Sequence, residues 1–508
     1  MKIFLKILFY LGLFSFMGYL LVQLFFQEEY NDFKNKVLHL SSDESTKLSY
    51  KTLNIAYAFG PESYEPTYFD SITRSRLVNV YESLVKTDRN LQIEPYLAVS
   101  WGRVSETEWE FKLRPNVTFH DGSVFNADDV IASFERARNY DKSQLDDVLK
   151  TIDSITKIDD LTVKIITTNP DPILVNRIST VLIFPSELNA FDKPVGTAAY
   201  KYLSSDYLDL NLTRFDEYWG EKPFYKDVSI KTIENRFDRL DQFKKGGIDI
   251  LANVPPSLIK DITESAVVTI SSLPSLEVNF LVFNMDGEIF KDKRLRQAVS
   301  IAFDKNAFTD FTLGYAQPSY QFVSNGIFGF NPEILPQKQD IDAAKKLIRD
   351  YDPFKRLGIV IDMAEGTEII GEYIKDQLNT IGFSVEINII PFEKLDEKIK
   401  KRESEIYYLG WKSELGDASN FYENAIYSKG KYNGGNYVNK KIDQLIEFSL
   451  SNFDTEKRSE QLREIMKIIV EEDIIGVPLF ESDVIYGVKA GIVFKPRLDG
   501  YILASEIK

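Results

Sequence analysis

The sequence has 508 residues, of which 44% are apolar and 27% charged, a composition typical of a folded protein with room for about three domains. It has no cysteine and only two histidines, His39 and His120, which excludes disulfide scaffolds, iron–sulfur clusters, cysteine nucleophiles and lipid-modified cysteine anchors. The net charge of −16 argues against nucleic acid as a partner, so the composition points to ligand binding more than to catalysis.

The first segment of the chain is apolar. Residues Ile7–Phe26 carry no charge, and as a helix these twenty residues would span about 30 Å, the thickness of a bilayer core. Lys2 and Lys6 precede this stretch, whereas Glu28 and Glu29 follow it. The positive-inside tendency therefore predicts that the N-terminus is cytoplasmic and that the chain after this segment is extracytoplasmic.

The apolar segment has three interpretations. A transmembrane signal anchor over 7–26, with a cytoplasmic tip at 1–6, is favoured because the run exceeds a signal-peptide core and ends without a small-residue cleavage site. A cleaved signal peptide and a buried core helix are the alternatives. The polar stretch 27–50 that follows has the composition of a tether.

Strand and helix patterns alternate through the rest of the chain. Alternating apolar residues predict strands at 51–57, 107–113 and 161–167. The clearest unit is a strand at 357–363, a helix at 367–381 ended by Gly382, and a strand at 383–389. A strand–helix–strand unit of this length predicts two parallel strands and an α/β lobe.

Three groups of motifs stand in a fixed order along the chain. They are Val80-Tyr81-Glu82-Ser83-Leu84-Val85 with Glu94 to Trp101 and Val117-Thr118-Phe119-His120-Asp121-Gly122, then Pro194-Val195-Gly196-Thr197 with Tyr218-Trp219-Gly220, then Asp292 to Val299 with Ala302-Phe303-Asp304-Lys305. In this order they resemble the family 5 extracellular solute-binding proteins, the peptide-, dipeptide- and nickel-type receptors of ABC importers. The resemblance extends over about 51–501.

The resemblance implies an α/β fold of the two-lobed periplasmic-binding-protein type (Venus-flytrap, class C type II) with an extra subdomain, to which the sequence adds the N-terminal transmembrane helix. In such receptors the ligand is enclosed when the lobes close about a hinge. The expected division is lobe 1 at 51–80, 192–275 and 478–508, the subdomain at 81–191, and lobe 2 at 276–477.

Several motifs have structural interpretations on physical grounds. His120-Asp121-Gly122 is expected to be a turn rather than an acid–base pair. Pro194–Thr197 lacks the lysine and glycines of a phosphate-binding loop and resembles the family's crossover between lobes. Asp292, Arg294 and Arg296 are expected to form a solvated helix start.

The segment Gly410–Phe421 is the predicted ligand-facing loop. In peptide binders of the family, an Asp three residues after the Trp pairs with the ligand's α-ammonium, and here Glu414 stands three residues after Trp411. Asp417 matches a second acidic position, and Asn420 belongs to the same segment. The alternative is an exposed acidic loop.

The rest of the predicted pocket is aromatic and polar. Tyr57 and Phe59 lie at or just after the end of the first strand, and Phe283-Asn284 opens lobe 2. Tyr57, Phe59 and Asn284 therefore complete the predicted site, with core packing as the alternative for the phenylalanines. The stretch Met363–Thr367 lacks the Arg that dipeptide-type members carry there, which favours longer peptides. Free nickel is disfavoured because histidine and cysteine are so scarce.

The predicted function is therefore a membrane-anchored receptor that captures oligopeptides and delivers them to an ABC permease. No cofactor, metal or enzymatic activity is expected, and the protein is expected to be a monomer. A peptide sensor with the same fold, acting without transport, is the alternative.

Overall fold

The computed structural model describes residues 52–508 apart from 207–208, 265–267, 353 and 355. The predicted tip, signal anchor and tether at 1–50 lie outside the described residues. Within the described part of the chain, no helix is both long and apolar enough to cross a bilayer.

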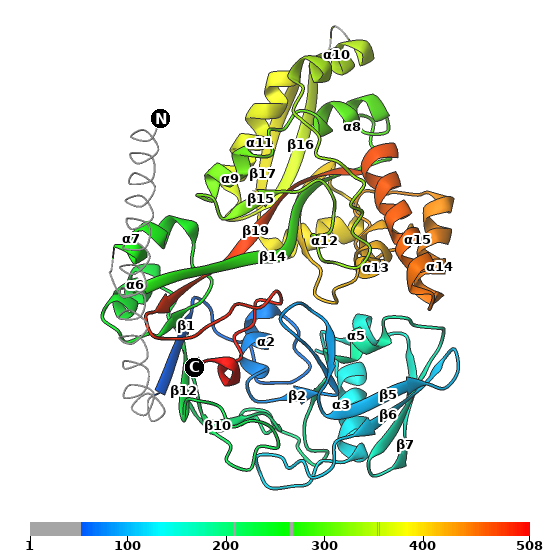
Figure 1. The fold of residues 1–508 in the computed structure, drawn as a ribbon. Coiled ribbons are helices and arrows are strands. Elements are labelled where there is room, and N and C mark those ends of the chain that lie inside the picture. Colours follow the sequence, from blue (N-terminus) through cyan, green and yellow to red (C-terminus); the bar gives the residue numbers. More distant parts are fainter. Residues whose placement is uncertain (1–51, 207–208, 265–267, 353, 355) are drawn as a thin grey trace, which may run out of the picture.

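Two long strands run through the centre of the molecule (Figure 1). They are β14 (Val268–Phe283) and β19 (Gly476–Lys489), which pair antiparallel and join the lower and upper halves of the molecule. On one side β19 pairs with β13 of the lower half, and on the other β14 pairs with β18 of the upper half, so one sheet in the order β10-β11-β12-β1-β13-β19-β14-β18-β16-β17 extends through both.

We call the part built on the first five strands of that order lobe 1. Its elements are β1 (Thr52–Tyr57), α2 (Ser71–Leu77), β10 (Tyr200–Asp206), β11 (Asp209–Arg214), β12 (Asp227–Thr232), α6 (Arg236–Lys244), β13 (Ile250–Leu251) and α7 (Ile259–Thr263). The predicted first strand is confirmed, and it pairs in parallel with β12 and β13. Alternate residues of β1 face opposite sides of the sheet: Ile55 belongs to one apolar core and Ala56 to another.

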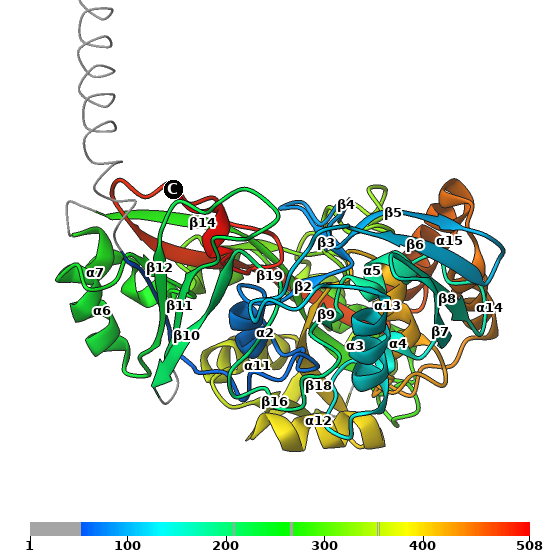
Figure 2. The ribbon, with the colours of Figure 1, turned by 90° about the horizontal axis from the view of Figure 1, so that it is seen from below.

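A separate four-stranded antiparallel sheet forms what we call the subdomain. Its order is β5-β6-β8-β7, made of β5 (Ala98–Arg103), β6 (Glu108–Leu113), β7 (Ile152–Asp159) and β8 (Thr162–Thr167), with helices α3 (Ala127–Asn139), α4 (Asp146–Leu149) and α5 (Leu174–Ile178). Short strands β2 (Glu82–Ser83), β3 (Val85–Thr87), β4 (Ile93–Pro95) and β9 (Leu182–Ile183) adjoin it. Seen from below, strands β5 to β8 of the subdomain lie at the opposite end of the molecule from α6 and α7 of lobe 1 (Figure 2).

Lobe 2 contains the predicted strand–helix–strand unit. β16 (Leu357–Ala364) and β17 (Phe383–Ile390) pair in parallel, and α11 (Glu368–Ile381) connects them, which confirms the prediction. Gly382 ends the helix with φ +123°, a conformation that L side chains rarely adopt. The other elements are α8 (Lys293–Ser300), α9 (Ala307–Phe311), β15 (Ala316–Pro318), α10 (Ile341–Tyr351), α12 (Phe392–Lys401), β18 (Ile406–Lys412), α13 (Ala418–Phe421), α14 (Lys440–Ser451) and α15 (Thr455–Lys467).

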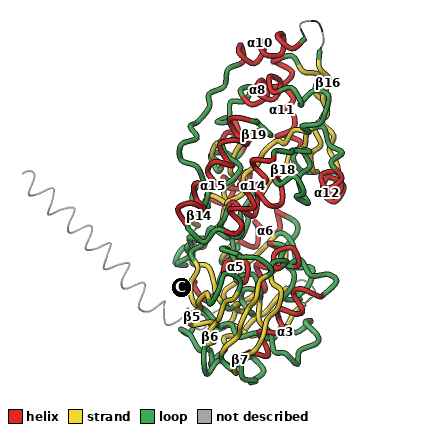
Figure 3. Tube along the Cα trace, turned by 90° about the vertical axis from the view of Figure 1, so that its right-hand side faces the viewer, coloured by secondary structure: helices red, strands yellow, loops and turns green. Residues whose placement is uncertain are grey.

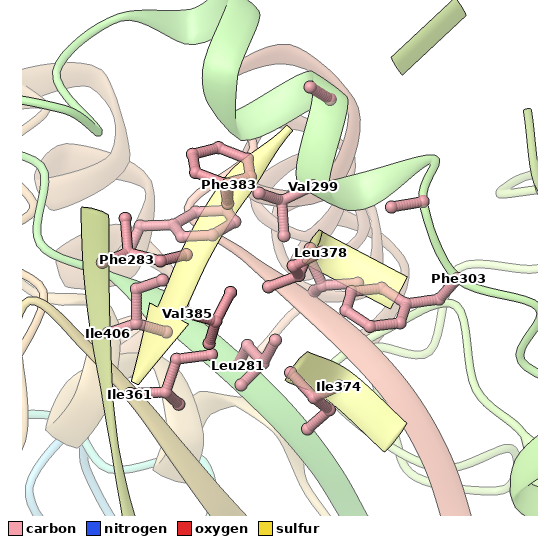
Figure 4. Close-up of a cluster of buried hydrophobic side chains, with 14 of the residues drawn as sticks. Leu281, Phe283, Val299, Phe303, Ile361, Ile374, Leu378, Phe383, Val385 and Ile406 are labelled. Carbon is pink, nitrogen blue, oxygen red and sulfur yellow. The ribbon is translucent and has the colours of Figure 1, made fainter. Parts of the chain in front are cut away.

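The lobe 2 sheet is covered by helices on both faces, as the side view shows (Figure 3). Alternation along β14 explains why: Leu281 and Phe283 enter one apolar core, whereas Phe280 and Val282 enter the other. In the first of these cores, α11 packs Ile374 and Leu378 against the strands (Figure 4). The lobe 2 sheet is therefore packed against an apolar core on each face.

The motif predictions have mixed outcomes. The turn at His120–Gly122 is confirmed, with Gly122 at φ +90°. Asp292 caps α8 as expected, since its carboxylate accepts a hydrogen bond from the Arg294 backbone at 2.9 Å. The predicted solvated helix start is wrong for Arg296, which is buried and donates to the carbonyls of Phe290 and Asp473.

Candidate ligand-binding site

Two adjoining cavities lie where lobe 1 and the subdomain face lobe 2. The first has a volume of about 410 Å³, and the second, beside the crossing strands, has about 500 Å³. Lys412, Asp499 and Tyr501 line both, so the cavities form one cleft. Each volume lies in the range of ordinary small-molecule sites.

Glu414 lies at the wall of the first cavity, just after β18. Its carboxylate is 3.5 Å from the Lys412 ammonium, which also donates to the carbonyl of Asp499 at 2.8 Å. The Glu414 side chain is 25% exposed, so it is partly screened from water but still accessible from the cleft. The loop predicted to face the ligand therefore places a carboxylate at the cleft wall.

The residues at the end of β1 line the second cavity. Tyr57 is buried and Phe59 is exposed at the surface of the cavity. The Arg76 guanidinium stacks 3.9 Å from the Tyr57 ring centre and donates to the Phe59 carbonyl at 2.6 Å, which fixes the segment after the strand. Burial raises the pKa of Tyr57, and the positive charge of Arg76 opposes that shift.

Asp417 differs from the prediction because its carboxylate already has partners inside lobe 2. It caps α13 and pairs with the buried guanidinium of Arg458 through contacts of 2.6 and 2.8 Å, and it accepts from the Ser419 hydroxyl at 2.6 Å. With Asp417 only 5% exposed and both oxygens bound, it organises the loop rather than facing the cleft. A ligand role for Asp417 is not retained.

Trp411, Asn420 and Asn284 line neither cavity of the cleft. Trp411 packs edge-on against Phe421 within lobe 2, beside a void of about 10 Å³ that could hold no more than one water. Asn420 lies in α13, and the Asn284 amide donates to the Ser404 carbonyl at 3.3 Å. These three predicted contacts are corrected, because alternation along β18 turns Trp411 into the core and β14 carries Asn284 to the far end of lobe 2.

Other residues of the cleft were not predicted. Arg74 and Arg76 lie on α2, the short helix after β1, and Glu277 lies where β14 passes from lobe 1 to lobe 2. Burial raises the pKa of Glu277, with the Lys412 charge lowering it and the Glu414 charge raising it. Ligands of parallel sheets bind at the carboxyl ends of strands, and α2 follows the carboxyl end of β1, so this rule is the sequence signal that could have found the two arginines.

The cleft is spanned at one end by contacts between the subdomain and lobe 2. Glu423 of lobe 2 accepts Lys150 at 2.7 Å and Arg177 at 3.2 Å, and the Asn176 amide donates to the Leu415 carbonyl at 2.9 Å. The Glu423 carboxylate is 15% exposed and Arg177 only 2%. We refer to Lys150, Arg177 and Glu423 as the interlobe ion cluster.

Two lobes joined by paired crossing strands around a ligand-sized cleft define the class of two-lobed solute-binding receptors. Residues 92–433, more than half of the chain, match the family described as bacterial extracellular solute-binding proteins, family 5, so the chain belongs to this family. The family consists of transport receptors, and the protein is accordingly not an enzyme. Among the described residues, no group of three or more histidine, aspartate or glutamate side chains is arranged to hold a metal ion.

Named relatives show the range of the family. The chain is 24% identical to the glutathione-binding protein GsiB of Pectobacterium atrosepticum, covering 76% of this chain and 80% of that one. It is also 24% identical to the dipeptide-binding protein of Escherichia coli, covering 83% and 88%. The structure of the ABC transporter substrate-binding protein CtaP from Listeria monocytogenes superposes with a TM-score of 0.81 at 22% identity, covering 90% and 99%. The last comparison supports the two-lobed fold.

Proposed function

We propose that the protein is the membrane-anchored, extracytoplasmic receptor of an ABC importer, which captures oligopeptides by closing its lobes and delivers them to the permease. The observation that carries the peptide assignment is the Glu414 carboxylate at the wall of a ligand-sized cleft. A partly buried carboxylate is the group that an ammonium leaving water requires.

The rest of the cleft supports a peptide ligand. Aromatic side chains line both cavities, including Tyr218 and Trp219 in the first, Tyr57 in the second and Tyr501 in both. Aromatic walls offer apolar contact area that accepts varied side chains. Among relatives of the same fold, AppA of Bacillus subtilis was solved with a nonapeptide, with a TM-score of 0.74 at 21% identity over 90% of this chain and 98% of that one.

Calorimetric titration of the purified full-length chain with short and long peptides tests this proposal. Free-amine peptides are expected to bind, and their N-acetylated forms about tenfold or more weakly, which corresponds to ~1.4 kcal/mol. Glu414→Gln should remove that difference. Glu397→Gln is the matched control, because Glu397 pairs with Lys401 on the exposed face of α12. Absence of binding by any peptide would refute the proposal.

The membrane anchor and the lobe boundaries remain proposals from the sequence. The anchor rests on the uncharged run at 7–26 and predicts that the chain sediments with membranes, whereas a chain lacking 1–26 is released. Recovery of both forms in the soluble fraction would contradict an uncleaved anchor.

A further inference from the structure

Arg74 is a buried arginine without an acceptor for its guanidinium. Its side chain is in the first cavity and 3% exposed, and no residue of the described chain forms a hydrogen bond or ion pair with it. The centre of the Phe69 ring lies 5.6 Å from its guanidinium carbon. An unpaired buried charge is costly, which is why buried charges in proteins are normally paired.

The described chain has seven buried arginines, and all but Arg74 follow this rule. Six of the seven have carbonyl or carboxylate acceptors: Arg76, Arg177, Arg239, Arg296, Arg458 and Arg497. Arg74 alone among them lacks one, and it is also the one that lines the first cavity without a partner.

The surroundings restrict what Arg74 can bind. Burial lowers the pKa of Arg74, while the Tyr501 hydroxyl and the Glu414 carboxylate favour its charged form. Lys412, the lobe 2 cation that lines the same cavity, has two partners of its own, the Glu414 carboxylate at 3.5 Å and the Asp499 carbonyl at 2.8 Å. Acidic side chains that line the same cavity outnumber basic ones: Glu82, Glu221, Glu414, Asp499 and Glu506 against Arg74, Lys86, Lys412 and Arg497.

We propose that Arg74 is the site at which the ligand's carboxylate binds. The planar guanidinium fork matches a carboxylate, and the acidic surroundings disfavour an anion of higher charge such as a phosphate. The inference rests on the proposed peptide function and narrows it: Arg74 and Glu414 line one cavity, so the ligand carries an anionic and an ammonium group close together. The carboxylate can come from the C-terminus of a short peptide or from an acidic side chain near its N-terminus.

Titration of the full-length chain with short mixed-sequence peptides separates these sources. One set has free C-termini, a second has C-terminal amides, and a third has amides with glutamate near the N-terminus. Wild type is expected to lose at least tenfold in affinity from the first set to the second. Recovery with the third set assigns the carboxylate to a side chain, and no recovery assigns it to the C-terminus.

Variants of Arg74 decide whether that residue is responsible. Arg74→Gln should bind all three sets alike, Arg74→Lys should keep part of the preference, and Arg138→Gln, on α3, should behave as wild type. Equal binding of acid and amide sets by wild type, or an unchanged preference in Arg74→Gln, overturns the inference while leaving peptide binding intact.

A ligand-free measurement keeps the inference testable if no peptide binds and the proposed function itself fails. Arg74→Met removes the unpaired charge, so its unfolding midpoint, after refolding to remove copurified ligand, should exceed that of wild type by about 1–3 °C. A lowered midpoint would mean that Arg74 supports the fold, and would overturn the inference whatever the peptides do.

Discussion

The Glu423 carboxylate of the interlobe ion cluster is expected to stabilise the contact between the subdomain and lobe 2. Glu423→Gln keeps the size of the side chain and an acceptor for Arg177 but removes the charge that faces Lys150 and Arg177. The Lys150 side chain is 42% exposed, so solvent screening limits its share to below about 1 kcal/mol. Arg177 is almost fully buried and contributes more.

Together these contacts predict that Glu423→Gln destabilises the closed state, in which the subdomain and lobe 2 touch through the cluster, by about 1–2 kcal/mol. That corresponds to roughly a 5–30-fold smaller ratio of closed to open molecules. Affinity for a ligand that needs the closed state should fall by up to the same factor. The loss should shrink with added salt, because the exposed part of the cluster is screened.

Single-molecule energy transfer between dyes on the subdomain and lobe 2 measures this ratio directly. Glu464→Gln is the control, because Glu464 pairs with Lys441 at 2.6 Å within lobe 2 and does not cross the cleft. If Glu423→Gln shows the same distance distribution as wild type and the control, the cluster does not hold the lobes and the reasoning is refuted.

Three further predictions concern stability. Burial lowers the pKa of His120 to about 4 from 6.5. The neutral His120 therefore stabilises the fold fully above pH 6.5, and this contribution is lost as the pH falls through 4. Denaturant unfolding should show a fall of ~2–3 kcal/mol in the free energy of unfolding over this range, and a smaller fall in His120→Gln. Burial lowers the pKa of Lys305 to about 7 from 10.5. The free energy of unfolding of wild type should therefore rise between about pH 7 and 10.5. Lys305→Met should be more stable than wild type at about pH 6 and should lack that rise. Gly196→Ala would place a methyl group 2.1 Å from the Val80 carbonyl oxygen and should cost roughly 3 kcal/mol, while Gly102→Ala, with open space, should cost far less on thermal unfolding. A flat pH response of wild type would contradict the first two, and equal losses in the two alanine variants would contradict the third.

The strand–helix–strand unit of lobe 2 was predictable because its signal is local. The period of apolar residues changes from strand to helix and back, and Gly382 marks the helix end, so neighbouring residues alone determine the interpretation. The turn at His120–Gly122 was predictable for the same reason.

The candidate site was only partly predictable because its residues come from distant segments. Glu414, expected from its spacing to Trp411, does lie at the cleft wall, but the same spacing argument failed for Asp417, whose partner Arg458 is 41 positions away in the chain. Arg74 carries no motif. What distinguishes it is the absence of an acceptor around it, and that is a property of the folded surroundings.

The pairing of β14 with β19 shifts register twice where β14 passes between the lobes, and the second shift lies between Asn279 and Phe280. Pairing with β19 skips from Pro274 to Val278, and within the gap Leu276 has φ +62°, a left-handed conformation. Leu276 lines the first cavity and Ser275 and Glu277 line the second. The residues that leave the regular strand pairing at the crossing are therefore also part of the cleft wall, so a ligand that touches Ser275–Glu277 bears directly on the backbone that joins the two lobes.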